Sequence, residues 1–382
     1  MAGEGPNLYT IPAGAPFLQS LAAAMLRGDL PTRGAPPNPF ELAGYTLYLP
    51  TRRACLAMRH AFLDASQCKA VLLPRIRPLG EIDDEALLLP TSATEDASPI
   101  ATQPGVMDPL ERRLVLTSLV LDWLRRMAAM PPADAVNDPM FAAATPASAC
   151  TLAGDLARLL DEAASEGVDL RRLAGFAEGR FASHWQLTLD FLDIIAKAWP
   201  RYLRDSGSID PVARRNERLL AEAERLRREG SVGPVIIAGS TGSIPATAAL
   251  MRAVLSLGNG AVVLPGLDPD MDEADWQGLG ETRPDHPQTG LKLLLDRLGL
   301  PRGQVRILSA EREAPVAGDR RLLLREAFRL GLARTGSKDV PALAPQRAAS
   351  ALEQVSLIAV SYTHLRAHET PEHLVCRLLL EK

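Results

Sequence analysis

Residues 235–255 read VIIAGSTGSIPATAALMRAVL, and AVVLPGLD follows at 261–268. The four residues Val235–Ala238 are typical of a buried strand, and they lead into a turn of Gly, Ser and Thr. Apolar residues at helical spacing come next, and a second apolar strand begins at Ala261. A strand, a helix and a strand in this order predict a β-α-β unit, the repeating element of a parallel sheet covered by helices.

The first 90 residues show the same alternation. We predict strands at Asn7–Ile11, Tyr45–Leu49 and Ala70–Leu73, with helices at Phe17–Arg27 and from Pro50 to about Ala65. In the second of these helices the residues at helical spacing are Leu56, Arg59, His60 and Leu63. The order β-α-β-α-β predicts one half of a doubly wound sheet.

From Leu110 the pattern changes to long amphipathic helices, which we place at 110–130, 151–166, 184–205 and 210–229. Asp210 before Pro211 is a favourable N-cap with proline at the first helical position. The sheet pattern returns at Val235. We therefore predict an α/β fold in which a helical insertion subdomain interrupts the parallel sheet.

The expected boundaries follow from these changes of pattern. Residues 1–90 form the first part of the α/β domain, 91–230 a loop and the helical insertion, and 231–310 the resumed α/β core. Residues 311–360 are expected to contain a helix and the start of a second α/β domain. Three of the six histidines lie in 361–382, whose composition differs from the rest, and we expect this tail not to be native.

Composition excludes several classes of protein. No run of about 18 uncharged apolar residues occurs, so no membrane-spanning helix is expected. The N-terminus lacks the basic-then-apolar pattern of a secretion signal, and the four cysteines are scattered without a CxxC pair. We therefore expect a cytoplasmic protein with no disulfide framework and no metal site. The formal net charge of −4 gives no overall attraction to nucleic acid.

Two kinds of catalytic motif require a lysine, and the chain has only five lysines at which to look for them. A phosphate-binding P-loop needs Gly-Lys-Ser/Thr, because the lysine neutralises the phosphates and the hydroxyl binds magnesium. No lysine here follows a glycine, and none has an acidic residue two positions before it, as a PD-(D/E)xK nuclease requires. We therefore expect neither ATP hydrolysis nor nuclease activity from this chain, and no cofactor. The positions of a degenerate nucleotide site would be Gly14, Ala238, Gly239, Ser240 and Thr241.

Three segments that follow predicted strands could nevertheless contact phosphate. The turn Gly239–Ser243 could cradle an anion at a helix N-terminus, or it could be a plain turn in which Ser243 or Thr241 caps the helix. The triplet Thr51-Arg52-Arg53 follows a predicted strand and could grip a DNA phosphate, or it could be a solvated helix start. Arg75, with Arg77, carries the same two alternatives.

Several segments together resemble one family. They are YTIPAGAPFL at 9–18, LPTRRA at 49–54, LLPRIRPLGE at 72–81, LLDE at 159–162, HWQLTLDFL at 184–192, IIAGSTGSIPAT at 236–247 and VLPGLD at 263–268. In this order they resemble the AddB family of double-strand break repair proteins, in its alphaproteobacterial form, over about residues 7–360.

The resemblance implies a superfamily-1 helicase fold of the P-loop NTPase type, here in a degenerate form. It implies the N-terminal part of a subunit of a helicase–nuclease that resects broken DNA ends, with an AddA-type helicase subunit, DNA ends and single-stranded DNA as partners. The family's nuclease domain would follow this region, so we expect a truncated chain that acts as a scaffold. Two alternatives are a small-molecule α/β enzyme or binding protein that uses the 239–243 turn for a phosphorylated ligand, and a structural partner protein without DNA contact.

Overall fold

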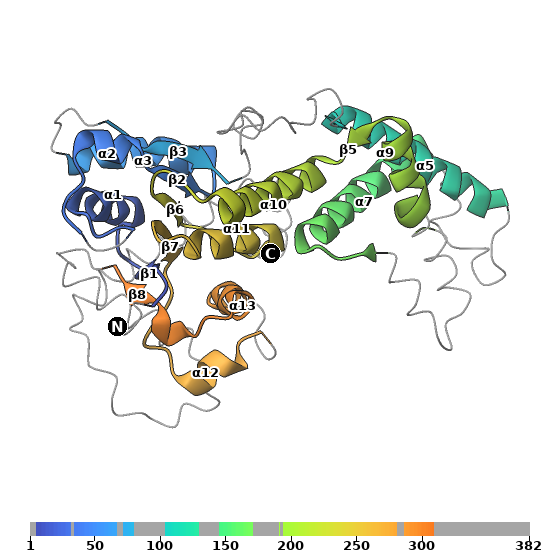
Figure 1. The fold of residues 1–382 in the computed structure, drawn as a ribbon. Helices are drawn as coiled ribbons and strands as arrows, with labels where there is room; N and C mark the ends of the chain where they lie inside the picture. The colour runs from blue at the N-terminus through green and yellow to red at the C-terminus, as the bar shows by residue number, and fades with distance from the viewer. Residues whose placement is uncertain are drawn as a thin grey trace. The chain divides into compact units, whose positions relative to one another are not determined.

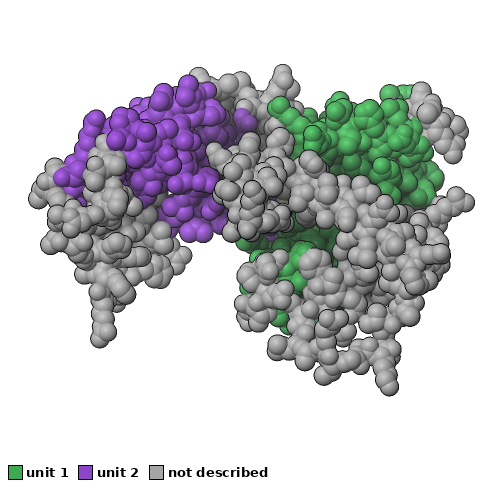
Figure 2. All heavy atoms as spheres, turned by 180° about the vertical axis from the view of Figure 1, so that it is seen from behind, with its two compact units in different colours: residues 1–78, 231–241, 254–382 green, residues 79–230, 242–253 purple. Residues whose placement is uncertain are grey.

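The computed structural model describes residues 5–31, 34–66, 72–79, 104–129, 145–170, 191, 194–280 and 286–308. Contacts divide the chain into two compact units (Figure 2). Unit 1 comprises Met1–Pro78, Ser231–Thr241 and Val254–Lys382, and unit 2 comprises Leu79–Gly230 and Gly242–Ala253. The regions expected at 311–360 and 361–382 lie outside the described residues.

Unit 1 is built on a six-stranded sheet (Figure 1). Its strands are β1 (Leu8–Ile11), β2 (Thr46–Leu49), β3 (Arg75–Pro78), β6 (Val235–Ala238), β7 (Gly260–Pro265) and β8 (Arg306–Ile307). They lie in the order β3-β2-β6-β7-β1-β8, and every pairing is parallel. The predicted α/β class with a parallel sheet is therefore confirmed.

The strands of the first 90 residues are not all neighbours. β1 pairs with β7 and β8, while β2 pairs with β3 and β6. In the sheet, β6 and β7 lie between β2 and β1, although both follow the helical segments in the chain. In register, Leu47 lies beside Ile236, and Ile237 lies beside Val262.

Helices α1 (Phe17–Arg27) and α3 (Arg52–Ala65) share one hydrophobic core with the sheet. Leu21 and Met25 lie one turn apart on α1, as Met58 and Phe62 do on α3, and all four are fully buried. The short helix α2 (Pro39–Ala43) starts at a capping box, in which Asn38 and Glu41 satisfy each other's backbone amides. Unit 1 also contains α12 (Glu273–Gly278), α13 (Thr289–Leu298) and a 3-10 turn at Arg302–Gln304.

The core also fixes which way the side chains of β2 and β3 point. Leu47 and Ile76 are neighbours in register, and both pack into the core shared with α1 and α3. Successive side chains of a strand point to opposite faces. Thr46 and Arg75, which are also neighbours in register, therefore point to the other face of the sheet.

Unit 2 is mainly helical. Its elements are β4 (Gly105–Val106), α5 (Pro109–Ala129), α7 (Pro146–Glu166), the π-helical turn η3 (Ile194–Ala198), α9 (Trp199–Asp205), β5 (Ser208–Ile209), α10 (Pro211–Glu229) and most of α11 (Pro245–Leu255). Leu116, Val120 and Trp123 of α5 pack with Ala153 of α7 and Trp199 of α9. Of the helix expected at 184–205, the structure describes the part from Ile194, with Phe191; the rest lies outside the described residues.

An ion-pair cluster centred on the buried Arg112 joins three helices of unit 2. Arg112 of α5 lies 2.8 Å from an Asp161 carboxylate oxygen on α7 and 3.0 Å from one on Asp210. The Asp210 side chain accepts a hydrogen bond from the Val212 amide at 3.3 Å and so caps α10. The N-cap predicted at Asp210 is confirmed.

One predicted strand is wrong. The apolar run Ala70–Leu73 predicts a strand. Ala70 and Val71 lie outside the described residues, Leu72 and Leu73 lie outside any strand, and β3 runs from Arg75 to Pro78. The Arg75 amide donates to the Tyr45 carbonyl at 2.9 Å and starts the pairing with β2. Pro78 is tolerated because β3 is an edge strand, where a missing amide breaks no ladder.

Within the described residues, the structure contains no helix that is both long enough and apolar enough to cross a bilayer.

Candidate functional site

The loops after the strands of a parallel sheet leave from one edge, where such sheets bind ligands. Three of these loops meet at Gly239, directly after β6. A Cβ atom on Gly239 would lie 3.3 Å from Cε1 of Phe17 and 3.6 Å from Cδ of Pro50. Phe17 begins the helix after β1, and Pro50 follows β2. The structure therefore brings the predicted nucleotide-site turn next to the segment that contains Thr51, Arg52 and Arg53.

The connection from β1 to α1 does not fit a nucleotide triphosphate. A phosphate loop holds its ligand with several backbone amides. Here Pro12 and Pro16 have no amide hydrogen, and the Ala15 amide donates to the Pro12 carbonyl at 3.2 Å. Gly14 adopts a left-handed φ of 91° in this short turn, and α1 starts at Phe17 without a side-chain cap.

The end of β6 is equally unsuited to magnesium. Ala238 is fully buried, and Gly239 has a φ of 74° and donates its amide to the Val263 carbonyl at 3.0 Å. Neither residue offers a carboxylate. Among the described residues as a whole, no group of three or more His, Cys, Asp and Glu side chains is arranged to hold a metal ion.

The turn after β6 leads into α11. α11 begins at Pro245, and the carbonyl of Ile244 accepts the first helical hydrogen bond, from the Ala248 amide at 3.0 Å. Ser240 and Thr241 are partly buried beside Gly239.

Thr10 fixes the neighbouring loop, which follows β7. The sequence analysis did not single out this residue. The Thr10 hydroxyl accepts a hydrogen bond from the Leu267 amide at 3.1 Å and donates to the Leu264 carbonyl at 3.2 Å. These partners lie more than 250 positions from Thr10 in the chain. No local pattern could have predicted them.

The side chain of Gln288 makes two further hydrogen bonds to the same loop. Its side-chain amide donates to the Gly266 carbonyl at 2.9 Å, and its side-chain oxygen accepts from the Asp268 amide at 3.1 Å. Nδ1 of the buried His286 accepts the backbone amide of Gln288 at 3.1 Å. The polar groups of this loop are thus used to fix its conformation.

Thr51, Arg52 and Arg53 form the start of α3. Thr51 is the N-cap, and its hydroxyl accepts the Ala54 amide at 3.1 Å. Arg52 and Arg53 are the first two residues of the helix and are exposed. The helix-start interpretation is therefore correct for Thr51, and both arginines are exposed residues in the segment that follows β2.

The exposed surface of α3 continues beyond its first turn. Cys55, Met58, Ala61 and Phe62 are the buried residues of this helix. The stripe singled out in the sequence, Leu56, Arg59, His60 and Leu63, is the exposed side instead. The sequence analysis did not place Arg59 and His60 on the same side of the helix as Arg52 and Arg53. The signal was the spacing, since Arg59 lies seven positions after Arg52 and His60 seven positions after Arg53.

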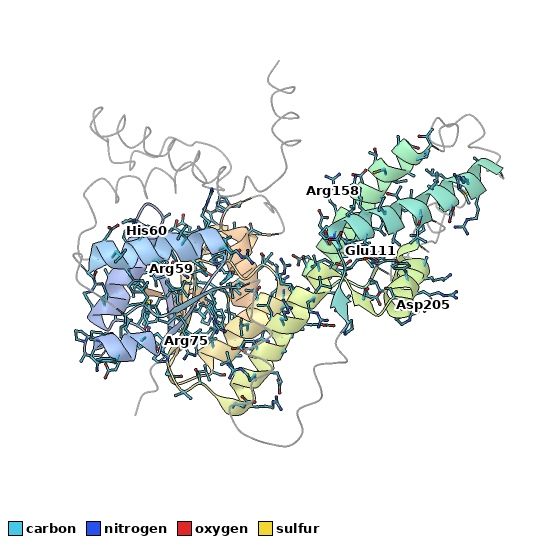
Figure 3. The ribbon with its side chains drawn as sticks, turned by 90° about the horizontal axis from the view of Figure 1, so that it is seen from above. Arg59, His60, Arg75, Glu111, Arg158 and Asp205 are labelled. Carbon is cyan, nitrogen blue, oxygen red and sulfur yellow. The ribbon has the colours of Figure 1, made fainter. Side chains whose placement is uncertain are left out.

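Arg75 does not belong with these residues. Because β3 begins at Arg75, opposite Thr46, Arg75 lies at the amino edge of the sheet rather than after a strand. The register from Thr46 to Leu49 separates the two edges by about 10 Å. Arg75 also points to the face opposite Leu47 and α3, and Figure 3 shows it apart from Arg59 and His60. Arg77 shares that opposite face.

No protein-family model matches this sequence, and a search of curated proteins finds no significant match. The proposals below therefore depend on the residues of the chain and on the resemblance of its motifs.

Proposed function

We propose that this chain is the helicase-like part of an AddB-type subunit, which acts with an AddA-type helicase subunit in the resection of broken DNA ends. In this proposal the chain is a cytoplasmic scaffold that guides single-stranded DNA and performs neither ATP hydrolysis nor nuclease chemistry. Its fold is a degenerate form of the superfamily-1 helicase domain.

The observation that supports this proposal most is the combination of a parallel sheet with unsuitable residues at its ligand edge. In an ATP-driven helicase, the strand before the phosphate loop and the strand with the magnesium-binding acid end at this edge. Here β1 leads into a loop with two prolines, and β6 ends at Ala238, which Gly239 follows. A parallel sheet is present, whereas the groups that would bind nucleotide at these two strand ends are missing.

The DNA-guiding role depends on the start of α3. Arginine guanidinium groups bind phosphate through charge-assisted, often bidentate hydrogen bonds. Arg52 and Arg53 are exposed at the edge where ligands of such sheets bind. They therefore form the proposed phosphate contact, with Thr51 fixing the helix start that presents them.

The proposal is tested by mixing the purified chain with the AddA-type helicase subunit encoded in the same genome. Size-exclusion chromatography should show one complex that binds single-stranded DNA, and ATP hydrolysis should come from the helicase subunit alone. Arg52→Ala/Arg53→Ala should leave the complex intact but weaken its DNA binding by at least about tenfold. If the two proteins elute separately, the chain is not a partner of that subunit and the proposal is wrong.

A further inference from the structure

The outer face of α3 carries one sign of charge along most of its length. Arg52 and Arg59 lie in one row and Arg53 and His60 in the next, so each pair is two turns apart, about 10.5 Å. The first carboxylate on this exposed face is Asp64, in the last turn. This basic face belongs to a chain whose formal net charge is −4.

Two exposed leucines share this face with the three arginines, Leu56 before Arg59 and Leu63 after it. Leu56 is 57% exposed and Leu63 is 48% exposed, although Phe62 next to Leu63 is fully buried. The spacing Arg52, Leu56, Arg59, Leu63 alternates cationic and apolar side chains along one line of the helix. A ligand that fits this line must offer negative charges with apolar surface between them.

We infer that a single strand of nucleic acid lies along the outer face of α3, with its phosphates on Arg52, Arg53 and Arg59 and its bases over Leu56 and Leu63. This inference rests on the proposed function, since it extends the same phosphate site from the first turn along the helix. A single strand fits because its unpaired bases present apolar faces. A duplex presents mainly phosphates and sugars to a helix alongside it, and it would leave the leucines without a partner.

The side of α3 opposite this face is anchored in the core. Met58 and Phe62 anchor the opposite side of the helix in the core that α3 shares with α1 and the sheet. The Thr51 cap fixes its first turn. The arginines are thus presented in a fixed spacing by a regular element of the fold.

Arg75 provides a matched control from the same unit. It is an exposed arginine, as Arg59 is, but it lies on the opposite face of the sheet (Figure 3). If binding depended only on the number of positive charges, Arg75→Ala and Arg59→Ala would weaken it equally. If the strand lies along α3, only Arg59→Ala should matter.

The test is a fluorescence anisotropy titration of the full chain with a labelled oligo(dT) strand of about 20 nucleotides and with a duplex of equal length, at several salt concentrations. Arg59→Ala should weaken single-strand binding about five- to tenfold and lower the salt slope by about 0.7. Arg59→Lys should restore most of that slope, because it keeps the charge. Leu56→Ser/Leu63→Ser should weaken binding to the strand more than to the duplex, and Arg75→Ala should change neither.

The outcomes separate this inference from the proposed function. If Arg52→Ala/Arg53→Ala weakens binding and Arg59→Ala does not, the phosphate site ends at the first turn and the path along α3 is wrong. If none of these variants changes DNA binding, both proposals are wrong. If the leucine variant disrupts the complex with the helicase subunit while DNA binding is unchanged, the α3 face binds a protein and the inference is overturned.

Discussion

Gly239 and Phe17 meet at the carboxyl edge of the sheet: a Cβ atom at position 239 would lie 3.3 Å from Cε1 of the Phe17 ring. Gly239 follows β6 and Phe17 begins the helix after β1, so an aromatic ring lies beside the two strand ends that would serve a nucleotide. The left-handed φ of 74° at Gly239 makes the same position unfavourable for any side chain.

Gly239→Ala should lower the free energy of unfolding by about 1–3 kcal/mol, because alanine is strained at this φ and its methyl group would press on Phe17. Urea unfolding followed by circular dichroism measures the change. Gly258→Ala is the control, since a Cβ there meets no atom within 4 Å and its φ is not left-handed. Equal losses in the two variants would contradict the account of this edge.

Magnesium-ATP should leave the melting temperature of the chain unchanged. A ligand at 100 times its Kd would stabilise the fold by about 2.7 kcal/mol, which a thermal-shift assay detects easily. The two prolines before Phe17 and the missing acid after β6 remove the groups that would bind the phosphates and the metal. A melting temperature that rises with nucleotide concentration would show that the site still binds nucleotide.

Phe62→Ala should cost about 3–5 kcal/mol of stability, because Phe62 is fully buried between α3, α1 and the sheet. Its neighbour Leu63 is 48% exposed, so Leu63→Ala should cost less than about 1 kcal/mol. Chemical denaturation of both variants compares the two sides of one helix. A larger loss for Leu63→Ala would mean that the outer face of α3 is covered within the folded chain.

The stability contributed by Asp210 should depend on pH. Burial raises the pKa of this carboxyl above its ordinary value of 3.8, although the Arg112 guanidinium at 3.0 Å pulls it in the opposite direction. A raised folded-state pKa means that folding favours the protonated carboxyl. The contribution is therefore complete below pH 3.8 and is lost as the pH rises through the folded-state pKa.

The difference in unfolding free energy between the wild type and Asp210→Asn should accordingly fall as the pH rises from 3.8 and then level off. Urea titrations at a series of pH values measure it. A difference that grows with pH would mean that the ion pair with Arg112 outweighs burial.

Local patterns predicted most elements of the sheet and its helices. The apolar run of β6 and the helical spacing of α1 gave their bounds, because a strand buried on both faces is apolar throughout and a helix with one buried side repeats its apolar residues about every 3.6 positions. The order of the strands did not follow from such patterns. Leu8 pairs with Val262, and no signal within either segment specifies a partner so distant in the chain.

The candidate site was predicted in part. Thr51-Arg52-Arg53 was correctly placed after a strand, but Arg75 was not, because the apolar run before it was taken for the strand. On α3, the sequence singled out Leu56, Arg59, His60 and Leu63 at helical spacing without deciding whether this stripe is buried or exposed. The structure buries Met58 and Phe62 and so exposes Arg59.

The salt dependence of single-strand binding shows whether phosphates bind the arginines of α3. If phosphates bind Arg52, Arg53 and Arg59, the logarithm of the association constant should fall with the logarithm of salt concentration at a slope of about −2, since each phosphate contact with a single strand contributes about −0.7. The slope should be the same with and without ATP. Failure to bind the strand, or binding that is independent of salt, would contradict the claim that this chain guides single-stranded DNA.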